Sequence, residues 1–176
     1  MTSPALTGTH LRTVLAHAPT SIVALGSLVD GQPDGMIAGS FVGISLDPPL
    51  VGVAIQDTSS TWPRLRSANA VGISVLTENH AHLVRQLAGP KEHRFDRVGW
   101  FTDGDAVHLD HCCAQLTTHV VEEIPLGDHI LAVLKVNDAT EFSTTRLPRL
   151  PSNNGRPHFS LTTAPTLPTK GHNDHV

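Results

Sequence analysis

The chain has few aromatic side chains and no tyrosine, with aromatic residues making up 4 % of its 176 residues. It also lacks any apolar run of about eighteen residues, which excludes a membrane-spanning helix. Basic charge is not in excess, because 12 Lys and Arg stand against 16 Asp and Glu, for a net charge of −4. A broad basic face for nucleic acid is therefore not expected, although this sum allows a small basic pocket.

Cysteine is scarce, and the two copies, Cys112 and Cys113, are adjacent. Neighbouring residues do not easily form a normal disulfide, so a disulfide framework is excluded. The first residues, Met1–His10, show no basic segment followed by an apolar core, so no secretory signal is expected. Together these features predict a reducing, cytoplasmic compartment and no membrane association.

Glycine and proline are frequent, with 14 and 13 copies, and they divide the sequence into short apolar runs. This pattern favours many strands over a few long helices. Strands are predicted at residues 21–29, 36–46, 50–56, 70–76, 112–121, 129–137 and 159–161. Short helices are predicted at 11–18 with Thr9 as N-cap, from Trp62 onward, and from Thr77 to Ala88, while 89–105 is predicted to be irregular. Hairpin-length links indicate an antiparallel β architecture, whose closure into a barrel the sequence leaves open.

The length fits one domain, predicted at residues 1–161, followed by a loose Pro-, Thr- and His-rich tail at 162–176. Within the domain, the segment 33–41 places small residues along a strand. A flat ligand can approach the main-chain N–H and C=O groups of such a strand. The alternative is that Gly39 and Gly43 mark bulges or tight packing inside a barrel.

A hydroxyl cluster, Ser59-Ser60-Thr61, precedes a helix that begins near Trp62. Free N–H groups at a helix start attract a phosphate, and Arg64 or Arg66 supplies a counter-charge in this interpretation. The alternative is ordinary helix capping, which needs no ligand.

Two histidine-bearing segments remain. Gly127-Asp128-His129 reads as a turn that leads into a strand, and a functional role for His129 requires a neighbouring ligand. The segment His108–Cys113 holds two His and two Cys. Its contiguous thiols depart from the spacing of structural zinc sites and face opposite sides of a strand, so no metal site is predicted. The sequence also lacks G-x-G-x-x-G, P-loop and G-x-S-x-G motifs, so a bound nucleotide would lie on a barrel surface.

Taken together, these segments resemble the flavin reductase-like family, whose members adopt an FMN-binding split barrel. The likeness runs from about Leu11 to Asn137 and is best in three places. These are Asp30-Gly31-x-Pro33-x-Gly35-Met36 leading to Ser45-Leu46-Asp47-Pro48-Pro49-Leu50-Val51, then Ser59-x-Thr61-Trp62 with Val75-Leu76-Thr77-Glu78, and finally Gly127-Asp128-His129-Ile130. The resemblance implies a mostly β fold, an antiparallel Greek-key split β-barrel with a few short flanking helices.

The resemblance also implies site residues. The ring of the flavin would contact Gly35, Met36, Ile37, Ala38, Gly39 and Ser40, and also Ala54, Ile55 and Gln56. Its phosphate would contact Ser60 and Thr61. Arg94 and Phe95 match a basic-aromatic pair of the family, and His129 matches a histidine that lies near the nicotinamide and is the predicted catalytic residue.

The implied activity is hydride transfer from NADH or NADPH to FMN (or FAD), with reduced flavin passing to a partner monooxygenase. The implied assembly is a homodimer with each flavin site at the dimer interface. Two alternatives share the fold: a flavin carrier without reductase turnover, and an oxidase-type enzyme that retains its flavin. A ligand-free interaction domain is a further alternative.

Two departures from the family pattern affect these expectations. Ile37-Ala38-Gly39-Ser40-Phe41 stands where the family commonly has T-A-S-S-F, so two hydroxyls beside the ring are lost. The late P-L-x-Y-x-x-G-x-Y segment of the family is replaced by residues 150–159, without tyrosine. The first change predicts an altered flavin affinity or potential, and the second concerns the nicotinamide site.

Overall fold

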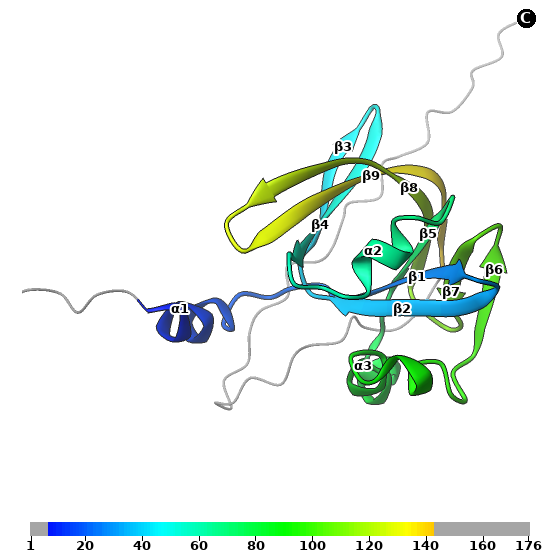
Figure 1. Ribbon diagram of the computed structural model, residues 1–176, viewed down its shortest axis with the longest axis horizontal. Helices are drawn as coiled ribbons and strands as arrows, with labels where there is room; N and C mark the ends of the chain where they lie inside the picture. The colour runs from blue at the N-terminus through cyan, green and yellow to red at the C-terminus, as the bar shows by residue number, and fades with distance from the viewer. Residues whose placement is uncertain (1–6, 143–176) are drawn as a thin grey trace, which may run out of the picture.

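Nine strands and a few short helices make up residues 7–142, the part of the chain that this computed structural model describes (Figure 1). The strands are β1 (Val23–Val29), β2 (Gln32–Ala38), β3 (Phe41–Leu46), β4 (Pro49–Gln56), β5 (Val71–Val75), β6 (Trp100–Asp103), β7 (Ala106–Leu109), β8 (Ala114–Leu126) and β9 (His129–Glu141). The helices are α1 (Gly8–Leu15), α2 (Trp62–Leu65) and α3 (Ala81–Leu87), with 3-10 turns η1 (Glu78–His80) and η2 (Lys91–His93).

All strand pairs are antiparallel, and the strands form one curved sheet. The order is β3-β4-β9-β8-β5-β1-β7-β6, with β2 paired to β1 outside this path. Within residues 7–142, β2, β3 and β6 each pair with another strand on one side only, so the sheet does not close into a barrel. This is the predicted fold class, mostly antiparallel β with a few short flanking helices.

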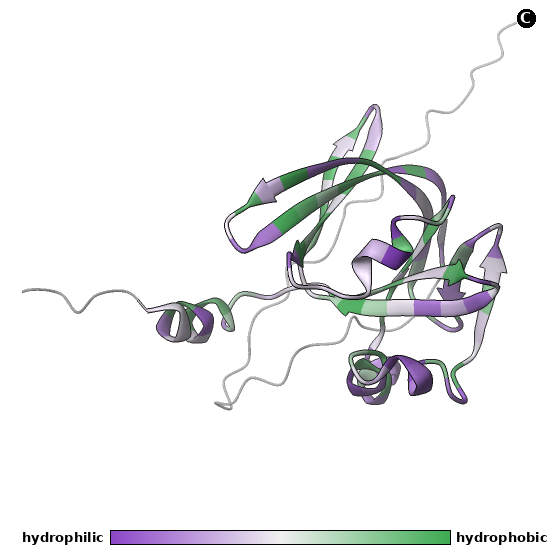
Figure 2. Cartoon of the chain, in the orientation of Figure 1, coloured by the Kyte–Doolittle hydropathy of each residue, from purple (hydrophilic) through white to green (hydrophobic). Residues whose placement is uncertain are grey.

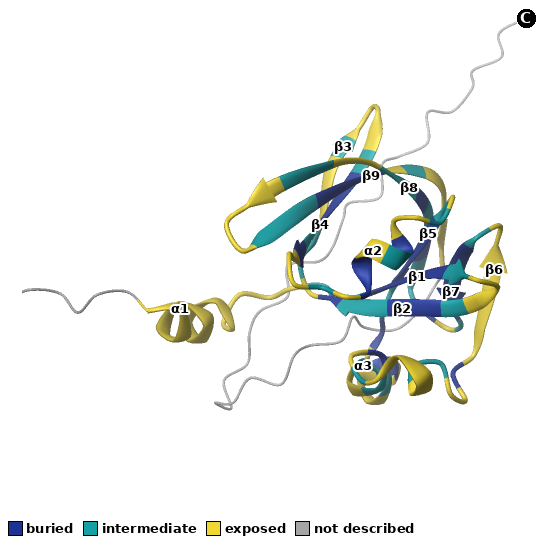
Figure 3. Ribbon diagram, in the orientation of Figure 1, coloured by how far each residue is buried: buried dark blue, intermediate teal, exposed yellow. Residues whose placement is uncertain are grey.

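Alternation along β1 divides the core into two clusters. Val23 and Leu25 pack in the cluster that contains Trp62, whereas Ile22 and Ala24 pack in the cluster beneath α3. Side chains on a strand alternate between its two faces, so one central strand serves both clusters. Figure 2 shows apolar residues along the strands of the sheet, and Figure 3 shows that the strands around α2 are the buried ones.

The predicted helices form, with corrections. α1 begins earlier than predicted, because Thr7 and not Thr9 is its N-cap: Thr7 Oγ1 accepts a hydrogen bond from His10 N at 3.2 Å. The helix predicted from Thr77 to Ala88 forms as the 3-10 turn η1 followed by α3, and Thr77 caps its start, with the Thr77 N–H donating to His80 Nδ1 at 3.1 Å. α1 buries none of its residues and stands apart from the sheet (Figures 1 and 3).

Two strand predictions were wrong in detail. The single strand predicted at 36–46 is two strands, β2 and β3, because the chain leaves the sheet at Gly39 and Ser40. The region 89–105, predicted to be irregular, contains β6, which pairs with β7 through a turn at Gly104 with φ of 58°. The strand predicted at 159–161, the domain boundary at 161 and the tail lie outside the described residues.

The helices within residues 7–142 are too short or too polar for any of them to cross a bilayer.

Candidate functional site

Most of the predicted flavin-contacting residues gather at one end of the sheet. They lie on β2 and the loop that follows it, at the end of β4, and in the loop before α2. A hydrogen bond of 2.7 Å from Ser40 Oγ to the carbonyl oxygen of Ala54 ties the first two groups together. The structure therefore places the small-residue segment beside the end of β4, with both segments close to the loop of Ser60 and Thr61.

The glycines of this region play different parts. A Cβ on Gly35 would lie 2.7 Å from the Leu25 carbonyl oxygen and 2.9 Å from Phe95 Cζ, so Gly35 allows tight packing of the Phe95 ring. Gly39 is exposed, and a Cβ there would meet only Thr20 Oγ1 at 3.6 Å. Gly43 adjoins a β-bulge in the β3–β4 ladder, which confirms the alternative interpretation for that residue.

A buried carboxylate lies at the centre of a group of cations. Asp34 on β2 is 1 % exposed, and its Oδ2 lies 2.6 Å from Arg64 Nε and 3.8 Å from Lys91 Nζ. Its Oδ1 accepts a hydrogen bond from Gly35 N at 2.9 Å and lies 3.5 Å from Arg94 Nη1. Three positive charges therefore face the one negative charge of Asp34.

Arg94 links three segments of the chain. Its Nε donates to the Gly89 carbonyl oxygen at 2.8 Å, and its Nη1 donates to the Gly35 carbonyl oxygen at 2.7 Å and to Thr61 Oγ1 at 2.8 Å. The side chain is 13 % exposed. Arg94 is therefore fixed next to two of the residues predicted to contact flavin, Gly35 and Thr61.

The hydroxyl cluster divides between capping and the cation group. Ser59 Oγ accepts a hydrogen bond from Trp62 N at 3.2 Å and so satisfies a backbone N–H at the start of α2. Thr61, the N-cap residue, is buried; its side chain makes no capping bond and pairs with Arg94. The Ser60 carbonyl oxygen accepts a bond from Arg64 Nη1. Of the two predicted counter-charges, Arg64 joins the cation group, while Arg66 turns to Glu123 on β8.

His129 opens β9 and faces the end of β4, where its register partner is Gln56. Its side chain is 35 % exposed, and its Nδ1 lies 2.7 Å from Asp128 Oδ1. The hydrogen bond from His129 holds the pKa of Asp128 below its ordinary value. A second contact, from Asp57 N to the Asp128 carbonyl oxygen at 3.2 Å, joins this turn to the loop after β4.

The histidines and cysteines of the 108–113 segment do not converge. Cys112 is buried and Cys113 half-buried, both are free thiols, and burial raises the pKa of each. His108 is buried on β7 with its Nε2 3.1 Å from Thr117 Oγ1, and burial lowers its pKa. Within residues 7–142, no three His, Cys, Asp or Glu side chains gather as metal ligands would.

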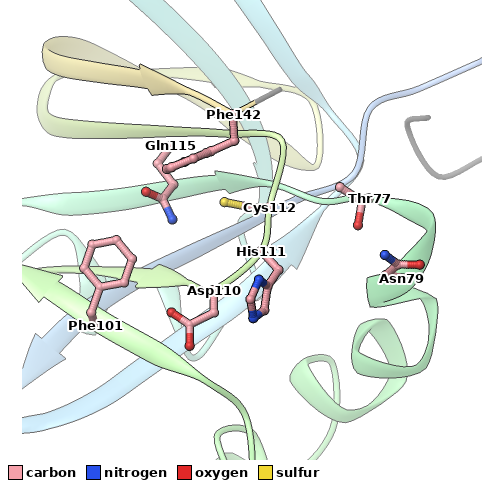
Figure 4. A pocket seen from close by; sticks show the side chains of 8 residues that line it. All are labelled: Thr77, Asn79, Phe101, Asp110, His111, Cys112, Gln115 and Phe142. Atoms are coloured by element: carbon pink, nitrogen blue, oxygen red, sulfur yellow. The ribbon is translucent and has the colours of Figure 1, made fainter. Parts of the chain in front are cut away.

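A cavity of about 540 Å³ lies elsewhere, at the start of β8 (Figure 4). It is lined by Thr77, Asn79, Phe101, Asp110, His111, Cys112, Gln115 and Phe142. None of the residues predicted to bind flavin or nicotinamide lines it.

The sequence interpretation missed Asp34 and Lys91. Asp34 stands between Pro33 and Gly35 in the small-residue segment 33–41, and nothing in this local sequence indicates that its carboxylate is buried. Lys91 follows Pro90 in a segment predicted to be irregular. Only the fold brings both residues to Arg64 and Arg94.

Comparison with known proteins relates this chain to one protein family. Residues 15–156 match the family described as flavin reductase like domain. An actinorhodin polyketide dimerase of Streptomyces coelicolor is 35 % identical over 130 residues, which cover 72 % of each chain. An NADH-dependent flavin reductase of a Rhodococcus species is 31 % identical over 136 residues, covering 76 % of this chain and 77 % of that protein. Among solved structures, an NADH:FAD oxidoreductase of Streptomyces globisporus superposes with a TM-score of 0.71 at 26 % identity, covering 81 % of this chain and 89 % of that one.

Proposed function

The chain belongs to the flavin reductase-like family, and we propose that it is an NAD(P)H:flavin oxidoreductase that transfers a hydride from NADH or NADPH to FMN or FAD. The observation that carries the proposal is the position of the cation group. Arg64 and Arg94 lie beside Ser60 and Thr61, and next to the small-residue end of β2. A flavin nucleotide joins a planar ring to an anionic tail, and these two features of the surface suit its two parts.

The charges of the residues present suit the phosphate of a flavin nucleotide. In this proposal the segment Gly35–Ser40 and the β4 end Ala54–Gln56 hold the ring, while Ser60, Thr61 and Arg94 hold the phosphate. The side chains of Arg64, Lys91 and Arg94 exceed the single carboxylate of Asp34 by two positive charges, which favours a phosphate. Bound flavin supplies the ring that accepts the hydride, and the protein supplies position and electrostatics.

The geometry gives His129 a defined tautomer. Asp128, with its lowered pKa, is ionised and can only accept, so His129 Nδ1 carries the proton of their hydrogen bond. In the neutral ring Nε2 then bears a lone pair. No residue within 7–142 bonds to that Nε2, which leaves it able to accept an N–H of the nicotinamide carboxamide. His129 thus orients the hydride donor.

Proton transfer is not required of any side chain in the hydride step itself, since the pair of electrons and the hydrogen move together. The task of the protein is to hold two rings in contact and to limit their freedom, which lowers the entropic part of the barrier. The arrangement has no nucleophile and no carboxylate pair among its site residues, as suits this chemistry.

We also propose that the active form is a homodimer whose second copy completes the flavin site. Exposed apolar side chains of residues 7–142 include Leu11, Val14 and Leu15 on α1 and Val42 and Ile44 on β3. A helix that buries nothing in its own chain gains stability by packing its apolar face on another surface. Val14→Glu with Leu15→Glu is expected to yield a monomer with weakened flavin binding, measured by analytical ultracentrifugation, and an unchanged dimer would refute this role of α1.

Reduced flavin released by the protein would supply a partner monooxygenase, in line with the family resemblance. The two free thiols further suit a reducing, cytoplasmic setting. A flavin that stays bound through repeated turnovers would instead favour the oxidase-type alternative.

A visible absorbance scan of the purified protein tests the function. The scan is repeated after NADH or NADPH is added, with and without free FMN. Loss of the flavin colour together with oxidation of the nicotinamide is expected. Protein that binds flavin but leaves both nicotinamides unoxidised would favour the carrier.

A further inference from the structure

Asp34 is an acid buried among cations that come from separate parts of the chain. Arg64 belongs to α2, Lys91 to η2 and Arg94 to the residue that follows η2. Each is within 4 Å of one or other oxygen of the Asp34 carboxylate. A charge at 1 % exposure is costly unless it is paired, and these three cations provide the pairing for Asp34.

The three cations differ in how much they depend on Asp34. Arg94 makes three hydrogen bonds to Gly89, Gly35 and Thr61 besides its approach to the carboxylate. Arg64 is 31 % exposed and has one other anchor, the Ser60 carbonyl oxygen. Without Asp34 the Arg64 side chain would lose its bond of 2.6 Å through Nε and would be free to turn to water.

Both arginines keep a donor for a ligand. Arg64 uses Nε and Nη1 and Arg94 uses Nε and Nη1, so the Nη2 group of each has no hydrogen bond to any residue in the 7–142 range. The planar guanidinium is directional, and an anchored one presents its remaining N–H groups in a fixed direction. The Asp34 carboxylate therefore offsets one of the three positive charges and also fixes the direction in which the Arg64 guanidinium points.

We propose that Asp34 is a positioning residue that holds Arg64 toward the phosphate of the flavin, and thereby sets the preference of this site for phosphorylated flavin over riboflavin. The proposal rests on the proposed function. It predicts an effect opposite in sign to simple charge neutralisation, because removing a negative charge would by itself strengthen the binding of an anion.

The test compares Kd values for FMN and riboflavin, which differ by the phosphate, in wild-type protein and in Asp34→Asn. Asparagine keeps the size of the side chain and an oxygen that can accept from Gly35 N. We expect Asp34→Asn to bind FMN about tenfold more weakly, as for loss of one charged hydrogen bond, with riboflavin affinity changed by less than about twofold. Stronger FMN binding, or an equal loss for both ligands, would overturn the proposal.

Three further variants test the proposal without relying on Asp34→Asn alone. Arg64→Gln removes the exposed partner, and we expect the same loss of FMN affinity with riboflavin unaffected. In the Arg64→Gln background, Asp34→Asn should add little, because both changes remove one contact. Arg66→Gln is the matched control, since Arg66 pairs with Glu123 away from this group, and its FMN affinity should equal that of wild type.

Measurements on wild-type protein distinguish a failure of this proposal from a failure of the proposed reductase function. If wild-type protein binds FMN and oxidises NADH or NADPH while Arg64→Gln keeps its preference for FMN over riboflavin, the role of Asp34 is wrong and the reductase function stands. If wild-type protein binds neither FMN nor riboflavin, both proposals fall.

Discussion

Replacement of His129 by alanine is expected to lower turnover while leaving the stability of the fold almost unchanged. Its Nδ1 contacts only Asp128, which is at the tip of the β8–β9 turn, and the imidazole is 35 % exposed. An exposed pair of this kind is screened by water and contributes little to stability. The urea midpoint of His129→Ala should therefore be close to that of wild type.

The effect on turnover should be larger, because the lost Nε2 contact positions the nicotinamide. A single positioned polar contact corresponds to about 1.4 kcal/mol or more in the transition state, so His129→Ala should lower turnover with NADH about tenfold or more. His129→Gln can restore part of the rate through its amide oxygen. Steady-state rates with FMN, beside urea unfolding of each variant, provide the measurement, and a variant with unchanged rates would remove His129 from the mechanism.

The remaining predictions concern stability and pH. Gly72→Ala would place a Cβ 2.3 Å from the Val107 carbonyl oxygen, and should lower the free energy of unfolding by about 3 kcal/mol. Gly43→Ala, whose Cβ meets nothing within 4 Å, should change it by less than about 0.5 kcal/mol; equal urea midpoints for the two variants would contradict the packing. Burial lowers the pKa of His108 from 6.5, so the unfolded chain takes up the proton first as the pH falls. Stability is therefore lost below about pH 6.5, and thermal melts should show a smaller loss in His108→Gln than in wild type. Arg94→Lys cannot reach Gly89, Gly35 and Thr61 together, and should lower the unfolding free energy by about 2 kcal/mol and weaken FMN binding; unaltered urea melts would contradict the three contacts.

The parts of the fold that the sequence predicts are those with local causes. Asp30 and Gly31 adopt φ of 54° and 73° in the β1–β2 turn, and such values favour these residue types in a two-residue hairpin turn. The alternation of Ile22, Val23, Ala24 and Leu25 likewise indicates a strand before any partner is known. These patterns are local, and the structure confirms them.

The parts that the sequence does not predict depend on distant residues. β2 and β3 look continuous in the sequence, but the link between them leaves the sheet, and Ser40 in that link bonds to Ala54, 14 residues later. Nothing in the neighbouring sequence marks Asp34 as a buried charge, and only the fold brings Arg64 to it from 30 residues away. Of the cation group, the sequence therefore indicated Arg64 as a counter-charge and Arg94 through the basic-aromatic pair of the family, but gave no signal for Lys91 or for the burial of Asp34.

Hydride transfer by the purified protein is the most direct test of the proposed activity. Protein and FMN are mixed anaerobically with NADH, and the visible absorbance of the flavin is followed together with oxidation of the nicotinamide. We expect one FMN to be bleached for each NADH oxidised, at a rate proportional to protein concentration and lowered in His129→Ala. Bleaching no faster than in a mixture without protein, for NADPH as well as NADH, would contradict the account.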